Sequence, residues 1–459
     1  MVERNVLRQN DARLGWVLND LPKPLTSATA VMLIDNGNKI ELRMPWHTSL
    51  ENTTTSVKHW WSAMLSLDAG EELKTCNFPS EILFQDEKGM VLLIGCLFSG
   101  YKSKGPVGVG RLEARAVVMD AHELGYTKVD GMRTVIPGLE KWLRINSVET
   151  TITRNGEGKP ESFSINGSSP EKILLSEDMG LALRPRWSVD RKATGENYVT
   201  QFVELETRSD GAINWEDHLE THGEFRDLVR LAIWAPVGYR TVEVNRESDP
   251  KTVGDTTIGE RWANLNSYLI VGYNGEGGDY TKPLFTFEDI KGDGYAKWRK
   301  ICKDFSRGVN PLMALLNNQG STIEMLLTQS VIGLEALALQ TAIEQGFTKK
   351  KRNDETITSR LGRLREEVPL NFLPKDWERK CAATYNGIKH ANRTMPDFDT
   401  VHENYLQCVL LFRLWVANRI GVPPAVLRER AERDPLMQKL DHLKAANPPS
   451  QWYKQNEDT

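Results

Sequence analysis

Near residue 290, the spacing of apolar residues along the chain changes from a strand-like to a helix-like pattern. Of all the features of the sequence, this change limits the possible folds most strongly. Before that point, short apolar or alternating stretches are separated by turn residues, as in 30–44, where Asn36-Gly37 divides two such stretches. An Asn-Gly pair in this position is typical of a β-hairpin. After residue 290, apolar residues recur at helical spacing. We therefore expect an α+β protein, with a β-rich N-terminal half followed by an all-α helical bundle.

The β-rich half contains further strand signals and one helix. A second hairpin is expected in 81–98, around the turn Glu87-Lys88-Gly89. Further strands are expected in 111–119, 161–167, 181–187, 198–207 and 239–245. Helical spacing of Phe225, Leu228 and Leu231 predicts a helix over 215–234. Since nearly 300 residues exceed one ordinary domain, this half is expected to form two sub-domains.

The helical half follows a boundary rich in Gly and Asp at 275–294. Helices are expected in 295–318, 321–344, 356–368, 375–393 and 400–420, with a basic connector at 348–355. A short charged helix and a polar tail should follow them. Together these features divide the chain into four parts. They are a β-rich domain at 1–145, a second β-rich sub-domain with one helix at 146–290, a helical domain at 291–430 and a polar tail at 431–459.

Composition excludes several classes of protein. The chain is 40% apolar and 26% charged, without a secretory start or an uninterrupted membrane-spanning run. A cytoplasmic location without membrane contact is therefore expected. The five cysteines are scattered and form no CxxC pair, which argues against a disulfide framework and a zinc ribbon. We expect them to be buried free thiols.

The segment 346–393 is basic although the whole chain carries a net charge of −4. It holds 12 Lys and Arg residues against 6 Asp and Glu residues. A basic segment on an acidic protein indicates a polyanionic partner. A solvated linker and helix face would give the same pattern, so both interpretations stay open.

Three other patterns are weaker. His218 and His222 are four residues apart on one expected helix face, which is metal-ligand spacing, but the segment is not HExxH and a half-exposed polar face is the simpler interpretation. The glycine-rich 272–280 lacks the GK[ST] of a phosphate loop and is expected to be a flexible loop. The adjacent Trp60 and Trp61 are expected in a core rather than a ligand groove. We therefore expect no metal and no cofactor.

The segment "TYNGIKHANR" (384–393) contains the side chains best suited to catalysis. Read as a helix, it places Asn386, His390 and Arg393 on one face, with His390 one turn beyond Asn386. An imidazole can move the 2′-hydroxyl or leaving-group proton during RNA cleavage, and a guanidinium can stabilise the charged phosphorane. This face therefore suits metal-free RNA cleavage, although a structural histidine on a polar helix face is the commoner case.

Two regions resemble a known family. The stretch 14–44 is similar to the opening of the ApeA N-terminal domain, with a Gly-Trp strand followed by a hairpin. Residues 322–339 resemble the first long helix of HEPN ribonucleases, with Glu335 as its internal glutamate, and 383–393 resembles the helix that bears the HEPN motif. The resemblance covers roughly residues 10–425. The chain thus resembles ApeA-type antiphage proteins, which end in a HEPN-like domain.

The resemblance implies functions for individual residues. His390 would act as acid or base, Asn386 would orient the phosphate or the imidazole, and Glu335 would support the site from the neighbouring helix. The family's motif arginine is missing, since positions 383–385 hold Ala, Thr and Tyr. Arg393 or Lys389 would have to supply its charge. The basic residues expected to attract the RNA backbone are Lys349, Lys350, Lys351, Arg352 and Lys389.

The resemblance also implies partners. These are RNA, with tRNA as the expected substrate, a phage-derived trigger protein, and a second copy of the chain in a homodimer or higher homo-oligomer with a composite cleft. The expected activity is abortive infection through a HEPN endoribonuclease. An alternative is an inactive HEPN scaffold for dimerisation or nucleic-acid binding, with sensing by the β-rich half. A third is a ligand-binding sensor in the β-rich half, with a purely oligomeric helical domain.

Overall fold

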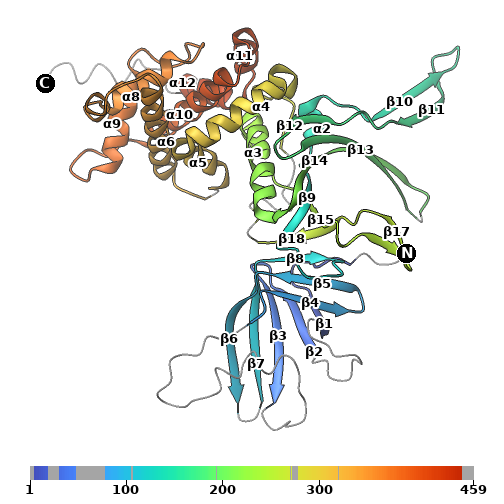
Figure 1. The fold of residues 1–459 in the computed structure, drawn as a ribbon. Coiled ribbons are helices and arrows are strands. Elements are labelled where there is room, and N and C mark those ends of the chain that lie inside the picture. Colours follow the sequence, from blue (N-terminus) through green and yellow to red (C-terminus); the bar gives the residue numbers. More distant parts are fainter. Residues whose placement is uncertain are drawn as a thin grey trace, which may run out of the picture.

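The computed structural model describes residues 5–18, 30–47, 78–104, 107–192, 194–268, 270, 278–318 and 320–446. A large β-sheet occupies the N-terminal half and helices fill the C-terminal half (Figure 1). The α+β fold class is therefore confirmed. Trp60, Trp61, Cys76 and most of the glycine-rich 272–280 lie outside the described residues.

The main sheet contains fourteen of the described strands in the order β12-β13-β14-β9-β15-β18-β8-β5-β4-β1-β2-β3-β7-β6. Its first eight strands in chain order are β1 (Ala12–Val17), β2 (Ala30–Asp35), β3 (Ile40–His47), β4 (Glu81–Asp86), β5 (Gly89–Ile94), β6 (Leu97–Lys104), β7 (Val107–Ala114) and β8 (Ala116–Met119). The others are β9 (Lys128–Val135), β12 (Ile173–Ser176), β13 (Leu181–Arg191), β14 (Asn197–Asn214), β15 (Thr241–Asn245) and β18 (Ala263–Asn266). Two separate hairpins pair β10 (Val148–Arg154) with β11 (Pro160–Gly167), and β16 (Lys251–Val253) with β17 (Thr256–Gly259).

The N-terminal strands β1–β8 surround a core of their own. Its residues run from Leu7 to Met119 and include the buried faces of the hairpins predicted at 30–44 and 81–98. Gly15 of the Gly-Trp strand is required here, because a side chain at this position would meet the Gln85 carbonyl and the Phe84 ring. Both hairpins are confirmed.

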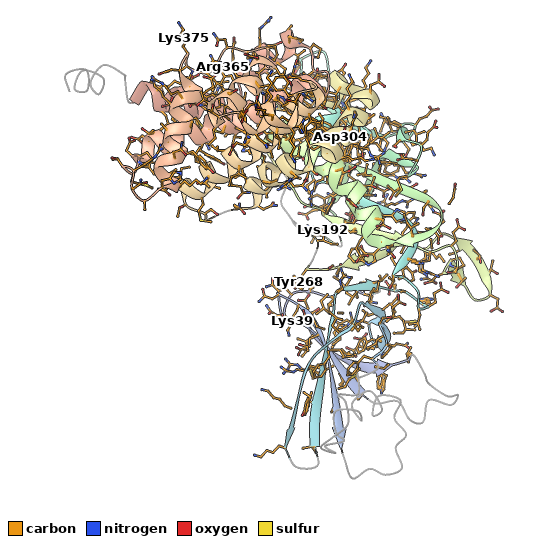
Figure 2. The ribbon with its side chains drawn as sticks, turned by 60° about the vertical axis from the view of Figure 1, so that its left-hand side comes forward. Lys39, Lys192, Tyr268, Asp304, Arg365 and Lys375 are labelled. Atoms are coloured by element: carbon orange, nitrogen blue, oxygen red, sulfur yellow. The ribbon has the colours of Figure 1, made fainter. Side chains whose placement is uncertain are left out.

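The short strand β18 joins the N-terminal strands to the rest of the sheet. Leu265 and Asn266 pair with β8 on one side, and Ala263 and Asn264 pair with β15 on the other. Tyr268 reinforces this link, since its hydroxyl donates a hydrogen bond to Asp35. Figure 2 labels Tyr268 at this boundary, close to Lys39 of the N-terminal strands.

The helix predicted at 215–234 is confirmed as α3 (Trp215–Ile233), which packs on β9 and β14. Short helix α2 (Leu139–Leu143) lies beside it in the same core. The helical half contains α4 (Phe287–Asp304), α5 (Ser306–Ala314), η1 (Leu315–Asn317), α6 (Ile323–Glu344), α7 (Lys349–Asn353), α8 (Ile357–Glu366), α9 (Trp377–Lys389), α10 (Phe398–Arg419), α11 (Pro424–Ala431) and α12 (Pro435–Ala446). The connector predicted at 348–355 was wrong in part, because Thr348 caps α7 by accepting a hydrogen bond from the Lys351 N–H.

Helix α6 packs against α5, α8 and α10 at the centre of the bundle. By length and composition it is the one described helix that could cross a membrane, and 50% of its most apolar window is buried inside the protein. Gly333 allows α5 to approach closely, since a side chain there would meet Leu312. These contacts place α6 at the centre of the helical bundle.

A single hydrophobic core joins the second part of the sheet, α3 and the helical bundle. Arg413 of α10 lies in this junction and is 1% exposed. Its guanidinium donates hydrogen bonds to the carbonyls of Leu231 and Ala232 at the end of α3, both at 3.0 Å, and pairs with Asp434 at 2.8 Å. The β-rich and helical halves are thus packed as one body here. A shared core does not show where one domain ends and the next begins. The domain boundaries predicted from the sequence therefore stay predictions.

Candidate functional site

Helix α9 carries the segment with the predicted catalytic residues. Trp377, Cys381 and Thr384 form its buried side, and Ile388 is half-buried, as the helical spacing predicts. The Cys381 thiol lies 3.6 Å from the Cys408 thiol of α10, and Thr384 accepts a hydrogen bond from Asn404. The opposite side of α9, with Asn386, therefore faces outward near the helix end.

The helix is shorter than predicted. It ends at Lys389, because His390 adopts an extended conformation with φ −113° and ψ 110°. The chain then turns, with the Arg393 N–H donating a hydrogen bond to the His390 carbonyl at 3.0 Å. The prediction that Arg393 continues the helical face was therefore wrong. The turn nevertheless keeps Arg393 beside His390.

Gly387 determines this arrangement, although the sequence pattern did not single it out. A Cβ at Gly387 would lie 3.0 Å from both the Thr394 carbonyl oxygen and the Pro396 ring. The loop after His390 therefore folds back onto α9 because position 387 has no side chain. The available signal was the glycine inside an otherwise helical pattern, since a residue without a side chain lets another stretch of backbone approach closely.

The end of α9 presents polar groups to solvent. His390 and Arg393 are exposed and Asn386 is half-buried. No hydrogen bond or ion pair among the described contacts engages their side chains, so all three are available to a ligand. The C-terminal end of a helix carries partial negative charge. A phosphate could bind there only with cationic help, which Arg393 and Lys389 can give. Lys389 lies over the Tyr385 ring at 5.5 Å.

Glu335, which was predicted to support the site from a neighbouring helix, lies on α6. It forms an ion pair with Arg360 of α8 at 2.8 Å, with both side chains 21% exposed. None of the described contacts joins Glu335 to His390, Asn386 or Arg393. Its predicted supporting role thus stays a prediction, and its observed partner is Arg360.

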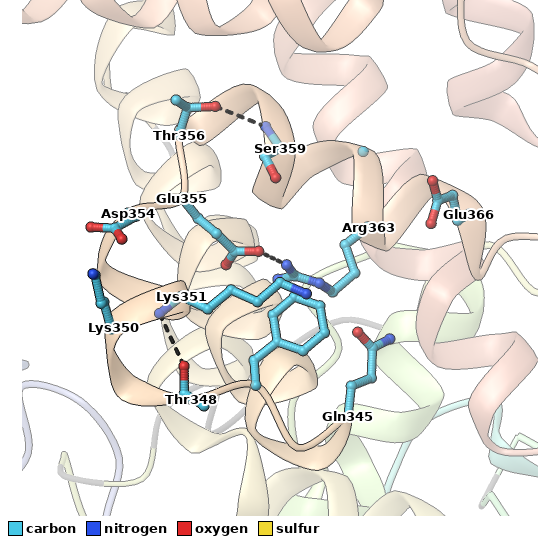
Figure 3. Close-up of a pocket in the computed structure, with 12 residues that line it drawn as sticks. Gln345, Thr348, Lys350, Lys351, Asp354, Glu355, Thr356, Ser359, Arg363 and Glu366 are labelled. Carbon is cyan, nitrogen blue, oxygen red and sulfur yellow. Dashed lines mark hydrogen bonds and ion pairs between the residues drawn. The ribbon is translucent and has the colours of Figure 1, made fainter.

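The basic segment 349–352 borders a cavity of about 860 Å³ between the end of α6, α7 and α8 (Figure 3). Lys350 and Lys351 line it, but so do Asp354, Glu355 and Glu366. Phe347 lies between two cations, with Lys351 3.4 Å and Arg363 4.7 Å from its ring centre. Arg363 also pairs with the buried Glu355. The local positive charge at the cavity is therefore largely balanced by carboxylates, which the residue count alone did not show.

His218 and His222 have a structural function in α3. Both are completely buried, so the expectation of a half-exposed face was wrong. The His218 Nε2 lies 3.2 Å from the Val129 carbonyl, which can only accept, so this nitrogen donates and Nδ1 accepts from Thr207 at 2.8 Å. Thr207 in turn accepts from His222 Nε2 at 2.9 Å, and His222 Nδ1 accepts from Thr134 at 2.7 Å. This chain satisfies both neutral imidazoles and ties α3 to β9 and β14.

The protonation states agree with that network. Burial lowers the pKa of His222 to about 3, and burial also lowers the pKa of His218. Protonating either ring would replace an acceptor by a donor within the chain of hydrogen bonds. Within the described residues, no group of three metal-ligating side chains gathers at this or any other position.

Comparison with known families identifies the N-terminal part. The model of ApeA N-terminal domain 1 matches residues 14–300, which is more than half of the chain. The match begins in β1, runs through the sheet and α3, and ends in α4. No curated protein and no solved structure matches the chain. The protein therefore belongs to the ApeA N-terminal domain 1 family.

Proposed function

We propose that this protein is a cytoplasmic antiphage defence protein whose helical half is a HEPN-like endoribonuclease. The β-rich half would recognise a phage-derived trigger, and the helical half would cut RNA, with tRNA as the expected substrate, to stop growth of the infected cell. Membership of the ApeA N-terminal domain 1 family supports the defence role. The observation that carries the catalytic part is the gathering of Asn386, His390 and Arg393 at the exposed end of α9.

The proposed reaction is transesterification through the 2′-hydroxyl of RNA. His390 takes the proton of that hydroxyl or gives a proton to the leaving 5′-oxygen. Arg393 neutralises the phosphorane from the adjacent turn, in place of the family arginine that is missing at 383–385. Asn386, one helical turn before His390, can donate its amide to a phosphate oxygen. The reaction needs no bond to a metal, because the nucleophile lies within the substrate.

A second copy of the chain fits the outer face of α6. Met325, Ile332 and Ile343 are exposed on this helix, at 63%, 48% and 45%. Since these three apolar side chains are exposed on one face of α6, this outer stripe would gain from contact with another apolar surface. We propose that a homodimer or higher homo-oligomer buries it.

The alternative function is an inactive HEPN-like scaffold for dimerisation or nucleic-acid binding. The missing motif arginine favours it, as does the balanced charge around the cavity at α7. The two functions differ in cleavage, since the scaffold would bind RNA without cutting it.

Incubation of purified protein with total tRNA tests the proposal. We expect wild type to cut tRNA and His390→Ala to lose at least about a hundredfold of that activity, the usual scale for a general acid or base. His442→Ala is the matched control, because His442 is an exposed histidine of α12 and lies 52 positions beyond His390. Equal cleavage by wild type and His390→Ala would refute the catalytic assignment, and binding without cleavage would favour the scaffold.

A further inference from the structure

A cavity of about 1000 Å³ lies where the N-terminal strands meet the rest of the sheet. One wall is the segment 5–9, which precedes β1, and another wall is formed by β15 and β18. Tyr268, labelled at this boundary in Figure 2, also lines the cavity. Small-molecule sites are common in cavities of this size at the junction between two parts of a protein.

The wall formed by β15 and β18 is polar because of the strand period. Side chains alternate between the two faces of a strand, and Val242 of β15 and Leu265 of β18 are completely buried in the core. Their neighbours lie on the opposite face and line the cavity, and these are Thr241, Glu243, Asn264 and Asn266. Since β15 pairs with β18 through Glu243 and Asn264, the two strands present one continuous surface of hydroxyl, carboxylate and amide groups.

The segment 5–9 contributes a buried acceptor without a partner. Asn5 is 7% exposed, and its Nδ2 donates hydrogen bonds to the Met90 carbonyl and the Asp120 carboxylate, both at 2.8 Å. These two bonds fix the amide plane and turn Oδ1 away from both acceptors. Oδ1 accepts no hydrogen bond from the described residues. Because an unpaired buried acceptor is unfavourable, a donor on a molecule in the cavity would be bound favourably there.

The cavity also has an apolar part. Four apolar side chains line it, each at most 5% exposed, and these are Leu7, Ile40, Met119 and Ile270. The Tyr268 side chain is 44% exposed, and its hydroxyl donates a hydrogen bond to Asp35, which holds the ring in place at the cavity. The lining therefore combines hydrogen-bonding groups with apolar surface and an accessible aromatic ring.

The charges at the cavity favour a neutral ligand. Two guanidiniums line it, those of Arg8 and Arg240, together with three carboxylates, those of Asp35, Asp120 and Glu243, which gives a formal sum of −1. The carboxylates would repel an anion such as a phosphate group, and the guanidiniums would repel a cation. A neutral ligand with many donors and acceptors avoids both penalties.

We propose that this cavity binds a neutral sugar ring, either in a free saccharide or as the ribose of a nucleoside. A hydroxyl both donates and accepts, so a ring with several hydroxyls matches a wall of carboxylate, amide and hydroxyl groups. Carboxylates are common partners of ribose hydroxyls. One hydroxyl would donate to Asn5 Oδ1, and the C–H face of the ring would lie on Tyr268. The site lies in the β-rich half, and binding there does not depend on ribonuclease activity.

Saturation-transfer difference NMR on the full-length protein tests this inference with two panels of probes. One panel contains the methyl glycosides of glucose, galactose and mannose, and the other contains adenosine, guanosine, cytidine and uridine. We expect saturation transfer to the sugar-ring protons of at least one probe, whose affinity is then measured by calorimetric titration. Binding of glycosides alone would identify a saccharide as the source of the ring, binding of nucleosides alone would identify ribose, and binding of both would support the shared sugar ring.

Variants of exposed strand residues assign the binding to the cavity. Asn264→Leu removes a donor and an acceptor from the β18 wall with little change in volume. Because Asn264 is exposed, this variant should fold as wild type does and bind the selected sugar at least about threefold more weakly. Thr241→Val, which removes one hydroxyl, should also weaken binding. Asn166→Leu is the matched control, since Asn166 is exposed on β11 and does not line the cavity.

Four results would overturn the inference. Two of them are no saturation transfer to any probe and equal affinity of wild type and Asn264→Leu. The third is equal binding of a nucleoside and its 2′,3′-dideoxy form, because the base rather than the sugar would then be bound. The fourth is binding of N-acetylglycinamide as tightly as the sugars, because any neutral amide would then fill the cavity. Cleavage of tRNA is measured separately, so sugar binding and ribonuclease activity can fail independently.

Discussion

The guanidinium of Arg413 donates a hydrogen bond to the Leu231 carbonyl, joining α10 of the helical half to the end of α3 across 182 positions of sequence. The same side chain bonds to the Ala232 carbonyl and pairs with Asp434, and all of these groups are buried. This junction therefore connects the end of α3 directly to α10, which packs against α9.

Removal of this junction should destabilise the protein strongly. Arg413→Ala leaves Asp434 buried without its partner, so we expect a loss of about 3–5 kcal/mol in the free energy of unfolding. Urea denaturation followed by circular dichroism measures it. Arg428→Ala is the control, since Arg428 is exposed on α11 and should change stability by less than about 0.5 kcal/mol. A loss below about 1 kcal/mol at Arg413 would contradict the described burial.

Acid should weaken the packing of α3 on the sheet through His222. Its pKa is about 3 in the folded protein, against 6.5 for an unperturbed histidine, so the unfolded chain binds more protons between these values. This contribution to stability is complete above pH 6.5 and declines as pH falls toward 3. Between pH 7 and pH 5, we expect it to account for a loss of about 2 kcal/mol.

The variant His222→Gln isolates that contribution. Whatever its stability at pH 7, it should lose about 2 kcal/mol less than wild type between pH 7 and pH 5 in urea denaturation. His442→Gln, at an exposed position of α12, should follow wild type at both pH values. An identical pH dependence of wild type and His222→Gln would show that the imidazole is not held neutral.

Gly387 should matter more for activity than for stability. Gly387→Ala places a Cβ 3.0 Å from the Thr394 carbonyl and the Pro396 ring, which displaces the loop that carries Arg393. We expect cleavage of RNA to fall at least about tenfold, because small displacements of reacting groups cost rate steeply. Gly362→Ala in α8 is the matched control, since a Cβ there meets nothing within 4 Å. That control should keep full activity and gain up to about 1 kcal/mol in stability. Full activity of Gly387→Ala would show that the turn carrying Arg393 is not part of the catalytic site.

Lys350 and Lys351 of the basic segment should contribute unequally to the affinity of the protein for RNA. Lys350→Gln should reduce the slope of log affinity against log salt by about 0.7, the value for one phosphate contact on a single strand. Lys351 is held over the Phe347 ring, so Lys351→Gln should lower the melting temperature more than it changes that slope. Fluorescence anisotropy with labelled tRNA at several salt concentrations measures both slopes. Equal slopes for wild type and Lys350→Gln would show that this segment is not part of the surface that binds RNA.

Short-range patterns predicted much of this fold. Alternation and the Asn36-Gly37 turn located the β2–β3 hairpin, and helical spacing located α3, α6 and α10 within a few residues. The residue at which α9 ends was not predicted from the sequence. Pro396 is the first helix-breaking residue after Gly387, but the helix already ends at Lys389. Periodicity also could not show that His218 and His222 are buried, since their partners Thr134, Thr207 and Val129 come from distant strands.

The candidate site was predicted less completely than the fold. His390 and Arg393 were identified from one segment, and the turn at the end of α9 keeps them adjacent. The pairing of Glu335 with Arg360 depends on how α6 packs on α8, which no local pattern encodes. Gly167 of β11 and the ring of Trp187 on β13 are likewise brought together only by the folded sheet.

His390 is proposed to catalyse metal-independent cleavage of RNA through the 2′-hydroxyl. Analysis of the ends of tRNA fragments, made in the presence of EDTA, tests it most directly. Wild type should leave 2′,3′-cyclic phosphate and 5′-hydroxyl ends, His442→Ala should do the same, and His390→Ala should leave none above the level of tRNA without protein. Fragments with 5′-phosphate ends, or the same fragments from His390→Ala as from wild type, would contradict the claim.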